Sequence, residues 1–332
     1  MTAWPAPRED ADLLVLIVAR IGDTLLVTPM LRALKAACPR GRLTVLAHPK
    51  RLAVLEHLPF VDRLGAITPG SAWLRGRLRG PRHDVAFVFG RDRALVDYAL
   101  RVSRHAVAFA QPGLSDAPGR LRLVPAPAAA MHAVEERLLL AQAAGVRADG
   151  MRLAYVITEP ERRWARDWLA RRGASGARPL VGLQTMSFPT KAHRNWPEAS
   201  FTELAALIAA RHPGARFVVL GDRDARAAGQ ALAQRLPGRV SIAAGETGLR
   251  QSAALIGTLD LYVGVDTGPT HIAGALDVPM IGIYHHAYPG RNLAPLERSR
   301  LRVLEQPAAG ELRVDAVMSA AAELLDEAGA RA

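Results

Sequence analysis

The sequence predicts an α/β protein made of two similar halves, each with a mostly parallel sheet. Short apolar runs alternate with helical patterns along the chain, which is typical of layered α/β folds. The pattern starts again after Arg178-Pro179. A length of 332 residues, half of them apolar, suits two domains of ordinary size. We expect these domains to cover residues 1–160 and 161–332.

Apolar runs in both halves are the strand candidates. They are short, continuous and rich in Val, Leu and Ile, as strands covered on both faces should be. The expected strands are Leu13–Ala19, Leu43–His48, Arg63–Ile67, Val85–Phe89, Ala106–Phe109, Leu180–Gln184, Phe217–Leu220, Val240–Ala243, Leu261–Val265 and Met280–Ile283. Ligands of open parallel sheets bind beyond the carboxyl ends of the strands, so we look for chemistry at the strand-to-helix elbows.

Composition restricts the classes of function. The single cysteine, Cys38, excludes an internal disulfide and suits a reducing compartment. The apolar run at 13–19 is too short to span a membrane and no basic segment precedes it, so a cytoplasmic protein is expected. A net charge of +12 suits nucleic acid, anionic lipid or a phosphorylated substrate. With 5% aromatic residues and no helix-turn-helix pattern, nucleic acid is not expected. The arginine-rich run at 73–82 is either a solvated loop or an anion-facing patch.

The first candidate site is the elbow Asp-Thr-Gly-Pro-Thr-His at 266–271, which follows an expected buried strand. Its proline suits the first turn of a helix, where a missing N–H costs nothing. The N–H groups of Thr270 and His271, with the Thr267 and Thr270 hydroxyls, then predict an anion site suited to phosphate. Gly268 lets the backbone approach a ligand closely. The alternative is a capped helix that binds no ligand.

The second candidate is the elbow Arg-Ile-Gly-Asp-Thr at 20–24, at the end of the first strand. Gly22 allows a tight turn or a close approach to a ligand. The Asp23 carboxylate can accept a proton from a sugar hydroxyl, or it can cap the helix. A helix N-terminus favours the ionised carboxylate, so Asp23 needs an apolar wall beside it to act as an effective base.

The third candidate is the loop at 184–197, after the first strand of the second half. It carries hydroxyls, including that of Thr185, an amide and the two cations Lys191 and Arg194. Such a loop can neutralise a pyrophosphate. The alternative is an ordinary polar loop that leads into a helix.

No metal site is expected. His285 and His286 are adjacent, so on a strand their side chains would point in opposite directions, and no further ligand has a suitable spacing. The sequence also lacks Gly-x-Gly-x-x-Gly, Walker-type and Gly-x-Ser-x-Gly signatures.

Three segments together resemble glycosyltransferase family 9, the ADP-heptose:lipopolysaccharide heptosyltransferases. They are LLVLIVARIGDTLLVTPMLRALKAACPRGRLTVLAHPK, GETGLRQSAALIGTLDLYVGVDTGPTHIAGALDVPMIGIY and, more weakly, NWPEASFTELAALIA. They occur in the family's order and the resemblance spans most of the chain, although residues 70–175 match only in character.

The resemblance implies a GT-B fold, in which two Rossmann-like domains face a central cleft. The first domain would hold the acceptor and the second the nucleotide-sugar donor, and the last helix is a candidate for packing back on the first domain. It also implies an inverting, metal-independent transfer of heptose from ADP-heptose to the inner core of lipopolysaccharide. The ADP-sugar would be a substrate, and no cofactor is expected.

The resemblance also assigns roles by position. Asp23 corresponds to the family's proposed general base, with Gly22 and Arg20 on the acceptor side. The donor-binding positions are Thr185, Lys191, Arg194, Asp266, Thr267, Gly268, Thr270 and His271. The family usually has Lys two residues before the Trp-Pro pair, where this chain has Arg194. Lys191 is the nearest lysine, and either cation can reach a phosphate.

We therefore expect a heptosyltransferase whose partners are a nucleotide sugar and an anionic glycolipid acceptor. It would attach peripherally to the cytoplasmic face of the inner membrane through its basic surface. One alternative is another enzyme on the same fold, either a transferase for a different nucleotide sugar or an epimerase or hydrolase. A second alternative is a non-catalytic member that binds nucleotide or glycan.

Overall fold

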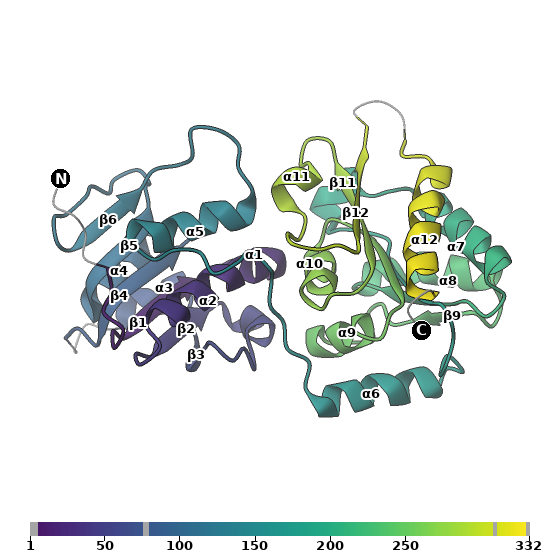
Figure 1. Ribbon diagram of the computed structural model, residues 1–332, viewed down its shortest axis with the longest axis horizontal. Coiled ribbons are helices and arrows are strands. Elements are labelled where there is room, and N and C mark those ends of the chain that lie inside the picture. Colours follow the sequence, from purple (N-terminus) through teal and green to yellow (C-terminus); the bar gives the residue numbers. More distant parts are fainter. Residues whose placement is uncertain (1–5, 76–79, 308–310, 330–332) are drawn as a thin grey trace. The chain divides into compact units, whose positions relative to one another are not determined.

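The chain divides into two compact units, Met1–Val156 and Ile157–Ala332 (Figure 1). A computed structural model describes residues 6–75, 80–307 and 311–329. Residues 76–79 of the arginine-rich run lie outside the described residues.

The first unit alternates strands and helices. In chain order these are β1 (Leu13–Ile17), α1 (Ile21–Leu26), α2 (Thr28–Ala37), β2 (Leu43–Ala47), η1 (Pro49–Val54), β3 (Arg63–Ala66), α3 (Pro69–Leu74), β4 (His83–Phe89), α4 (Arg93–Val102), β5 (Ser103–Phe109), β6 (Leu121–Val124) and α5 (Ala133–Ala143).

The second unit repeats this alternation. Its elements are α6 (Glu159–Ala170), β7 (Leu180–Gln184), η2 (Pro189–Arg194), α7 (Glu198–Arg211), β8 (Arg216–Leu220), η3 (Arg223–Ala225), α8 (Arg226–Arg235), β9 (Val240–Ile242), α9 (Leu249–Ile256), β10 (Leu261–Val265), α10 (Gly268–Ala275), β11 (Met280–His285), α11 (Gly290–Leu293), β12 (Leu301–Gln306) and α12 (Val314–Gly329).

Each unit contains one parallel sheet, and the two sheets have the same strand order. Among the described residues, the first sheet runs β3-β2-β1-β4-β5-β6 and the second runs β12-β11-β10-β7-β8-β9. All the strand pairs are parallel. The order reverses beside the first strand of each sheet, between β1 and β4 and between β7 and β10. Doubly wound sheets of this kind bind ligands at that switch point, beyond the carboxyl ends of the strands.

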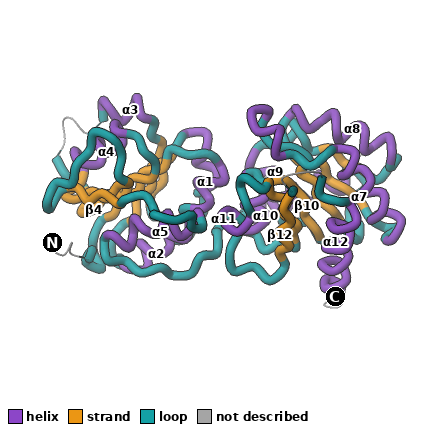
Figure 2. Tube along the Cα trace, turned by 90° about the horizontal axis from the view of Figure 1, so that it is seen from above, coloured by secondary structure: helices purple, strands orange, loops and turns teal. Residues whose placement is uncertain are grey.

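Helices flank each sheet: in the second unit α7 and α12 pack against each other on one face, while α9 packs against α10, as the tube view in Figure 2 shows. There Val181 and Val263 point to the face packed by α7 and α12, and join their residues in one apolar core. In the first unit Leu14 and Val88 face α3 and α4 in a second core. Burial on both faces explains why the central strands are continuous apolar runs, and the prediction of two α/β halves with mostly parallel sheets is confirmed.

Two strands were not expected, β6 and β12, and each lies at the edge of its sheet. The sequences LRLV and LRVLEQ contain charged or polar residues, and β12 is only partly buried along its length. An edge strand has a sheet neighbour on one side only. It therefore does not need the continuous apolar run by which the central strands were recognised.

The last helix packs within the second unit. Val317, Ala321 and Leu324 of α12 are fully buried in the core of that unit, where the helix contacts α7, β10 and β11. Its apolar face therefore contributes to the core of this unit.

Candidate functional site

The elbows of the second unit meet at the switch point of its sheet. The loop with Thr185 follows β7 and the elbow with Asp266 follows β10, and these strands are neighbours with Gly264 opposite Gln184. Residues separated by about eighty positions in the sequence therefore lie at the same edge. The sequence had singled out both segments, and the sheet brings them together.

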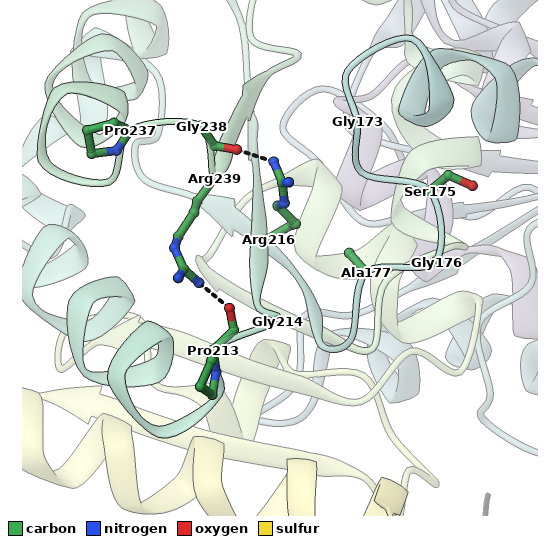
Figure 3. Close-up of a pocket in the computed structure, with 10 residues that line it drawn as sticks. All are labelled: Gly173, Ser175, Gly176, Ala177, Pro213, Gly214, Arg216, Pro237, Gly238 and Arg239. Atoms are coloured by element: carbon green, nitrogen blue, oxygen red, sulfur yellow. Dashed lines mark hydrogen bonds between the residues drawn. The ribbon is translucent and has the colours of Figure 1, made fainter.

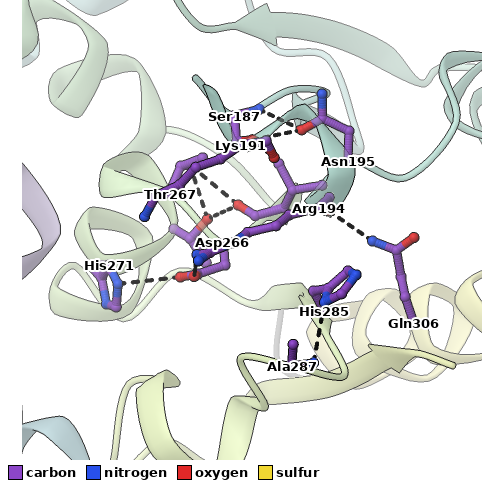
Figure 4. A network of polar contacts seen from close by, with 12 residues as sticks. Ser187, Lys191, Arg194, Asn195, Asp266, Thr267, His271, His285, Ala287 and Gln306 are labelled. Carbon is purple, nitrogen blue, oxygen red and sulfur yellow. Dashed lines mark hydrogen bonds and ion pairs between the residues drawn. The ribbon is translucent and has the colours of Figure 1, made fainter. Parts of the chain in front are cut away.

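Asp266 lies between two basic side chains (Figure 4). Its Oδ2 is 3.7 Å from Nη1 of Arg194, and its Oδ1 is 3.6 Å from Nε2 of His271. All three side chains are largely buried, at 8% exposed or less for Arg194 and His271 and 12% for Asp266. These separations are longer than hydrogen bonds, so the contacts are electrostatic and leave hydrogen-bonding capacity unused.

The backbone donors at this elbow differ from those expected. The N–H groups of Thr270 and His271 both point to the carbonyl of Thr267, at 3.1 and 3.4 Å, so neither is free. Within the described ranges, the N–H groups of Thr267 and Gly268 donate no hydrogen bond. An anion at the start of α10 would therefore meet these two donors, three residues before the pair that was predicted.

The Thr270 hydroxyl also differs from the expectation, because it serves the elbow itself. Thr270 is fully buried, and its Oγ1 donates to the carbonyl of Val265 at 2.6 Å and lies 3.0 Å from the Tyr262 hydroxyl. Gly264 makes room for this arrangement, since a Cβ there would lie 2.6 Å from the Tyr262 hydroxyl. Burial raises the pKa of Tyr262, so this phenol stays neutral. Thr270 thus stabilises the turn, and its hydroxyl is turned away from an incoming ligand.

Three buried polar atoms of the predicted site have no hydrogen-bond partner within the described residues. They are Nε of Arg194, Nδ1 of His271 and Oγ1 of Thr185. An unsatisfied buried donor costs about 1–3 kcal/mol, so each such group calls for a physical explanation, and a ligand that completes it is one. All three belong to segments that follow β7 or β10.

The structure distinguishes between the two cations of the loop after β7. Arg194 ends η2 with its guanidinium buried beside Asp266, and its Cζ lies 3.3 Å from the ring centroid of Tyr288. Lys191 is half-buried in the same short helix, at a position whose backbone is not helical. The stacked tyrosine holds Arg194 in a fixed orientation, as cation–π pairs do. Tyr288 was missed because it lies on a later loop, far from the motifs.

Histidines gather beside Arg194. The ring of His285 is 4.1 Å from that of His286 and 5.5 Å from that of His193. The expectation that His285 and His286 point in opposite directions is wrong, because β11 ends at His285 and His286 already lies in the turn. Burial, with the neighbouring histidines and Arg194, lowers the pKa of His285. Among the described residues, no group of three or more His, Cys, Asp or Glu is arranged to hold a metal ion.

In the first unit, Asp23 lies in the first turn of α1, just beyond the carboxyl end of β1. Its side chain is 42% exposed, and its Oδ1 accepts a hydrogen bond from Nη2 of Arg137 at 2.9 Å. Gly22 has an ordinary helical conformation in the same turn, so no special backbone geometry requires a glycine there. Arg20 precedes the helix and is exposed.

Arg137 was missed by the sequence reasoning, although the sequence contains a signal for it. It occupies the apolar stripe of α5 beside Val134, Leu138 and Ala141, and all four are buried. A charged residue on a buried helical stripe is unusual and needs a partner. Nothing in the sequence indicates that the partner is Asp23, which lies 114 positions away.

A cavity of about 500 Å³ lies elsewhere in the second unit (Figure 3). It is lined by residues that precede β7 and β9 and by residues that precede or begin β8, so it is at the opposite edge of the sheet from the elbows. Arg239 donates to the carbonyl of Pro213 at 2.6 Å and Arg216 donates to that of Gly238. These arginines tie loops together, and the cavity carries none of the predicted site residues.

No helix in the described part of the chain is both long and apolar enough to cross a bilayer.

Comparison with known proteins identifies the family. The model of glycosyltransferase family 9 (heptosyltransferase) matches residues 120–316, more than half of the chain. Lipopolysaccharide heptosyltransferase 3 of Escherichia coli is 26% identical over 283 residues, which is 79% of this chain and 80% of that protein. Lipopolysaccharide heptosyltransferase 2 of Salmonella typhimurium is 25% identical over 295 residues, 83% of each chain.

Solved structures share the fold. A family 9 glycosyltransferase from Veillonella parvula superposes with a TM-score of 0.83 at 19% identity, covering 97% of this chain and 99% of that one. ADP-heptose lipopolysaccharide heptosyltransferase II of E. coli gives 0.77 at 21% identity, covering 96% and 99%. The two parallel sheets with flanking helices are therefore those of a GT-B protein. The chain belongs to glycosyltransferase family 9 and is a glycosyltransferase of the heptosyltransferase family.

Proposed function

We propose that this enzyme transfers heptose from ADP-heptose to the inner core of a lipopolysaccharide acceptor, by a single displacement that inverts the anomeric carbon. The named activities of the two curated relatives support this class of donor and acceptor. The observation that carries the proposal is the set of unpaired buried donors beyond β7 and β10, centred on Arg194.

The second unit would hold the diphosphate of the donor. The free N–H groups of Thr267 and Gly268 meet one phosphate, and Arg194 supplies the fixed positive charge. These groups are already oriented before the reaction, so they stabilise the negative charge that develops on the departing ADP. Because fixed protein groups compensate this charge, the proposal needs no metal ion. His271 would complete the diphosphate site, and Asp266 would face the sugar.

The first unit would supply the base. Asp23 takes the proton from an acceptor hydroxyl, and the hydroxyl oxygen forms a bond to the anomeric carbon of the heptose. The bond from that carbon to the β-phosphate oxygen breaks, and ADP leaves with the electron pair. Oδ1 of Asp23 is bound to Arg137, whereas Oδ2 has no hydrogen bond within the described residues and is the oxygen that would accept the proton.

Calorimetric titration with ADP, UDP, GDP and CDP tests the donor, and turnover of ADP-heptose on a lipopolysaccharide acceptor in excess EDTA tests the reaction. We expect selective ADP binding, a product of inverted anomeric configuration by NMR, and activity that EDTA leaves intact. Asp23→Asn should abolish turnover and retain ADP binding. Preference for UDP or GDP would overturn the assignment of ADP-heptose as the donor. ADP binding without turnover would favour the non-catalytic alternative.

We also propose peripheral attachment to the cytoplasmic face of the inner membrane, supported by the net charge of +12. Sedimentation with vesicles tests this: binding to anionic but not to neutral vesicles, reversed by salt, is the expected result, and equal binding to both would contradict it.

A further inference from the structure

Arg137 of α5 is the only hydrogen-bond partner of the Asp23 carboxylate among the described residues. Its Nη2 donates to Oδ1 at 2.9 Å, and the contact joins residues of two elements, α5 and α1, at the carboxyl edge of the first sheet. We propose that Arg137 is a positioning residue, which holds the Asp23 carboxylate so that Oδ2 is presented to the acceptor hydroxyl. The proposal rests on the role of Asp23 as the base.

The guanidinium of Arg137 is itself held on several sides. Its Nη1 donates to the carbonyl of Ala133 at 2.7 Å and to Oε2 of Glu136 at 2.9 Å. Its Cζ lies over the ring of Phe89, 5.0 Å from the centroid, where β4 ends beside β1. A planar guanidinium with contacts in its plane and on its face has little freedom to turn. Arg137 is therefore a rigid support for a carboxylate that is otherwise partly exposed to water.

The burial of the Arg137 side chain indicates that it supports Asp23 and does not itself bind the substrate. The Arg137 side chain is 8% exposed, whereas the Asp23 side chain is 42% exposed. A substrate in solvent therefore meets Asp23 more readily than Arg137.

The charges in this cluster also suit a base. Arg137 contacts two carboxylates, those of Asp23 and Glu136, so its positive charge is shared. The group of three keeps one net negative charge.

Orientation of the carboxylate is the larger effect. A base held within reach of the proton reacts faster than one that rotates freely, and a displacement of about 1 Å can lower the rate about 100-fold.

Steady-state kinetics of Arg137→Met and Arg137→Lys test the proposal, with Arg93→Met as the matched control. Arg93 forms an exposed pair with Asp97 in the same unit, so its loss should leave kcat unchanged. We expect kcat to fall about 10- to 100-fold in Arg137→Met and less in Arg137→Lys, since general-base catalysis contributes about 10²–10⁴ and Asp23 itself remains. ADP affinity should change less than about twofold.

Two readouts separate positioning from a purely structural role. In Arg137→Ala, added guanidinium should restore part of kcat, and it should restore none in Asp23→Asn. The double variant Asp23→Asn/Arg137→Met should be no slower than Asp23→Asn alone, because residues that act through one another are not additive. Thermal unfolding of each variant checks that it is folded. If Arg137→Met does not fold, Arg137→Lys takes its place in the test, because it keeps the buried positive charge.

The failures are distinguishable. If Asp23→Asn keeps wild-type turnover, the base assignment fails and the positioning role fails with it. If Asp23→Asn is inactive while folded Arg137→Met and Arg137→Lys keep full kcat, only the positioning role is overturned. A rise in acceptor KM with kcat unchanged would show that Arg137 binds the acceptor directly, which also overturns it.

Discussion

Replacing Arg194 by methionine is the sharpest test of the donor site. The guanidinium is 8% exposed, its Nε has no partner among the described residues, and its contact with Asp266 is a long 3.7 Å. Methionine keeps the length and the packing under Tyr288 but removes the charge. A hydrogen bond to a charged group contributes about 1.5–3 kcal/mol, so ADP should bind about 10- to 150-fold more weakly.

We expect the loss of ADP affinity to lie in the upper part of this range, because the loss of Arg194 leaves the Asp266 carboxylate free to repel the diphosphate. Without Arg194, the Asp266 carboxylate stands near the diphosphate with its cation removed, and like charges repel more strongly in a buried site. The double variant Arg194→Met/Asp266→Asn removes that repulsion and should therefore recover part of the affinity. A double-mutant cycle measures this coupling directly.

The assay is calorimetric titration with ADP at one fixed salt concentration, with far-UV circular dichroism to confirm folding. Lys191→Met is the matched control: it removes a cation from the same short helix, and we expect it to weaken ADP less than Arg194→Met. The reasoning is refuted if folded Arg194→Met binds ADP as the wild type does, or if Lys191→Met has the larger effect.

The remaining predictions concern stability. Burial alone would raise the pKa of Glu161, but bidentate hydrogen bonds from Arg250 at 2.7 Å and those from Thr158 outweigh it and lower the pKa to about 2. Glu161→Gln should therefore cost about 2 kcal/mol in urea unfolding at pH 7, after allowance for partial exposure, and the difference from wild type should shrink as pH falls from 4.5 towards 2. A difference that persists at the lowest pH would contradict this. Thr270→Val should cost about 0.5–1.5 kcal/mol, because it removes the buried hydrogen bond to the carbonyl of Val265 and the contact with the Tyr262 hydroxyl, while ADP affinity changes little. Loss of ADP affinity with unchanged stability would contradict this and would show that the Thr270 hydroxyl binds the ligand.

The sequence by itself determined the central architecture. Strands such as Leu13–Ile17 and Leu261–Val265 are buried on both faces, and this condition produces continuous apolar runs that can be read directly. The elbows followed from the same pattern, since a polar segment after a buried strand must lie at its carboxyl end. The edge strands β6 and β12 were not predicted, because a partly buried strand does not need a continuous run of apolar residues.

Only the tertiary structure decided which polar groups are paired and which are left for a ligand. The sequence could not show that the N–H groups of Thr270 and His271 are used within their own turn, or that the buried Arg194 guanidinium lies beside Asp266. It also could not pair Asp23 with Arg137, 114 positions away. Local periodicity reports which face of an element is buried. Hydrogen bonds and ion pairs between distant segments depend instead on side-chain distances of a few ångströms, which are set only when the sheets and helices have packed.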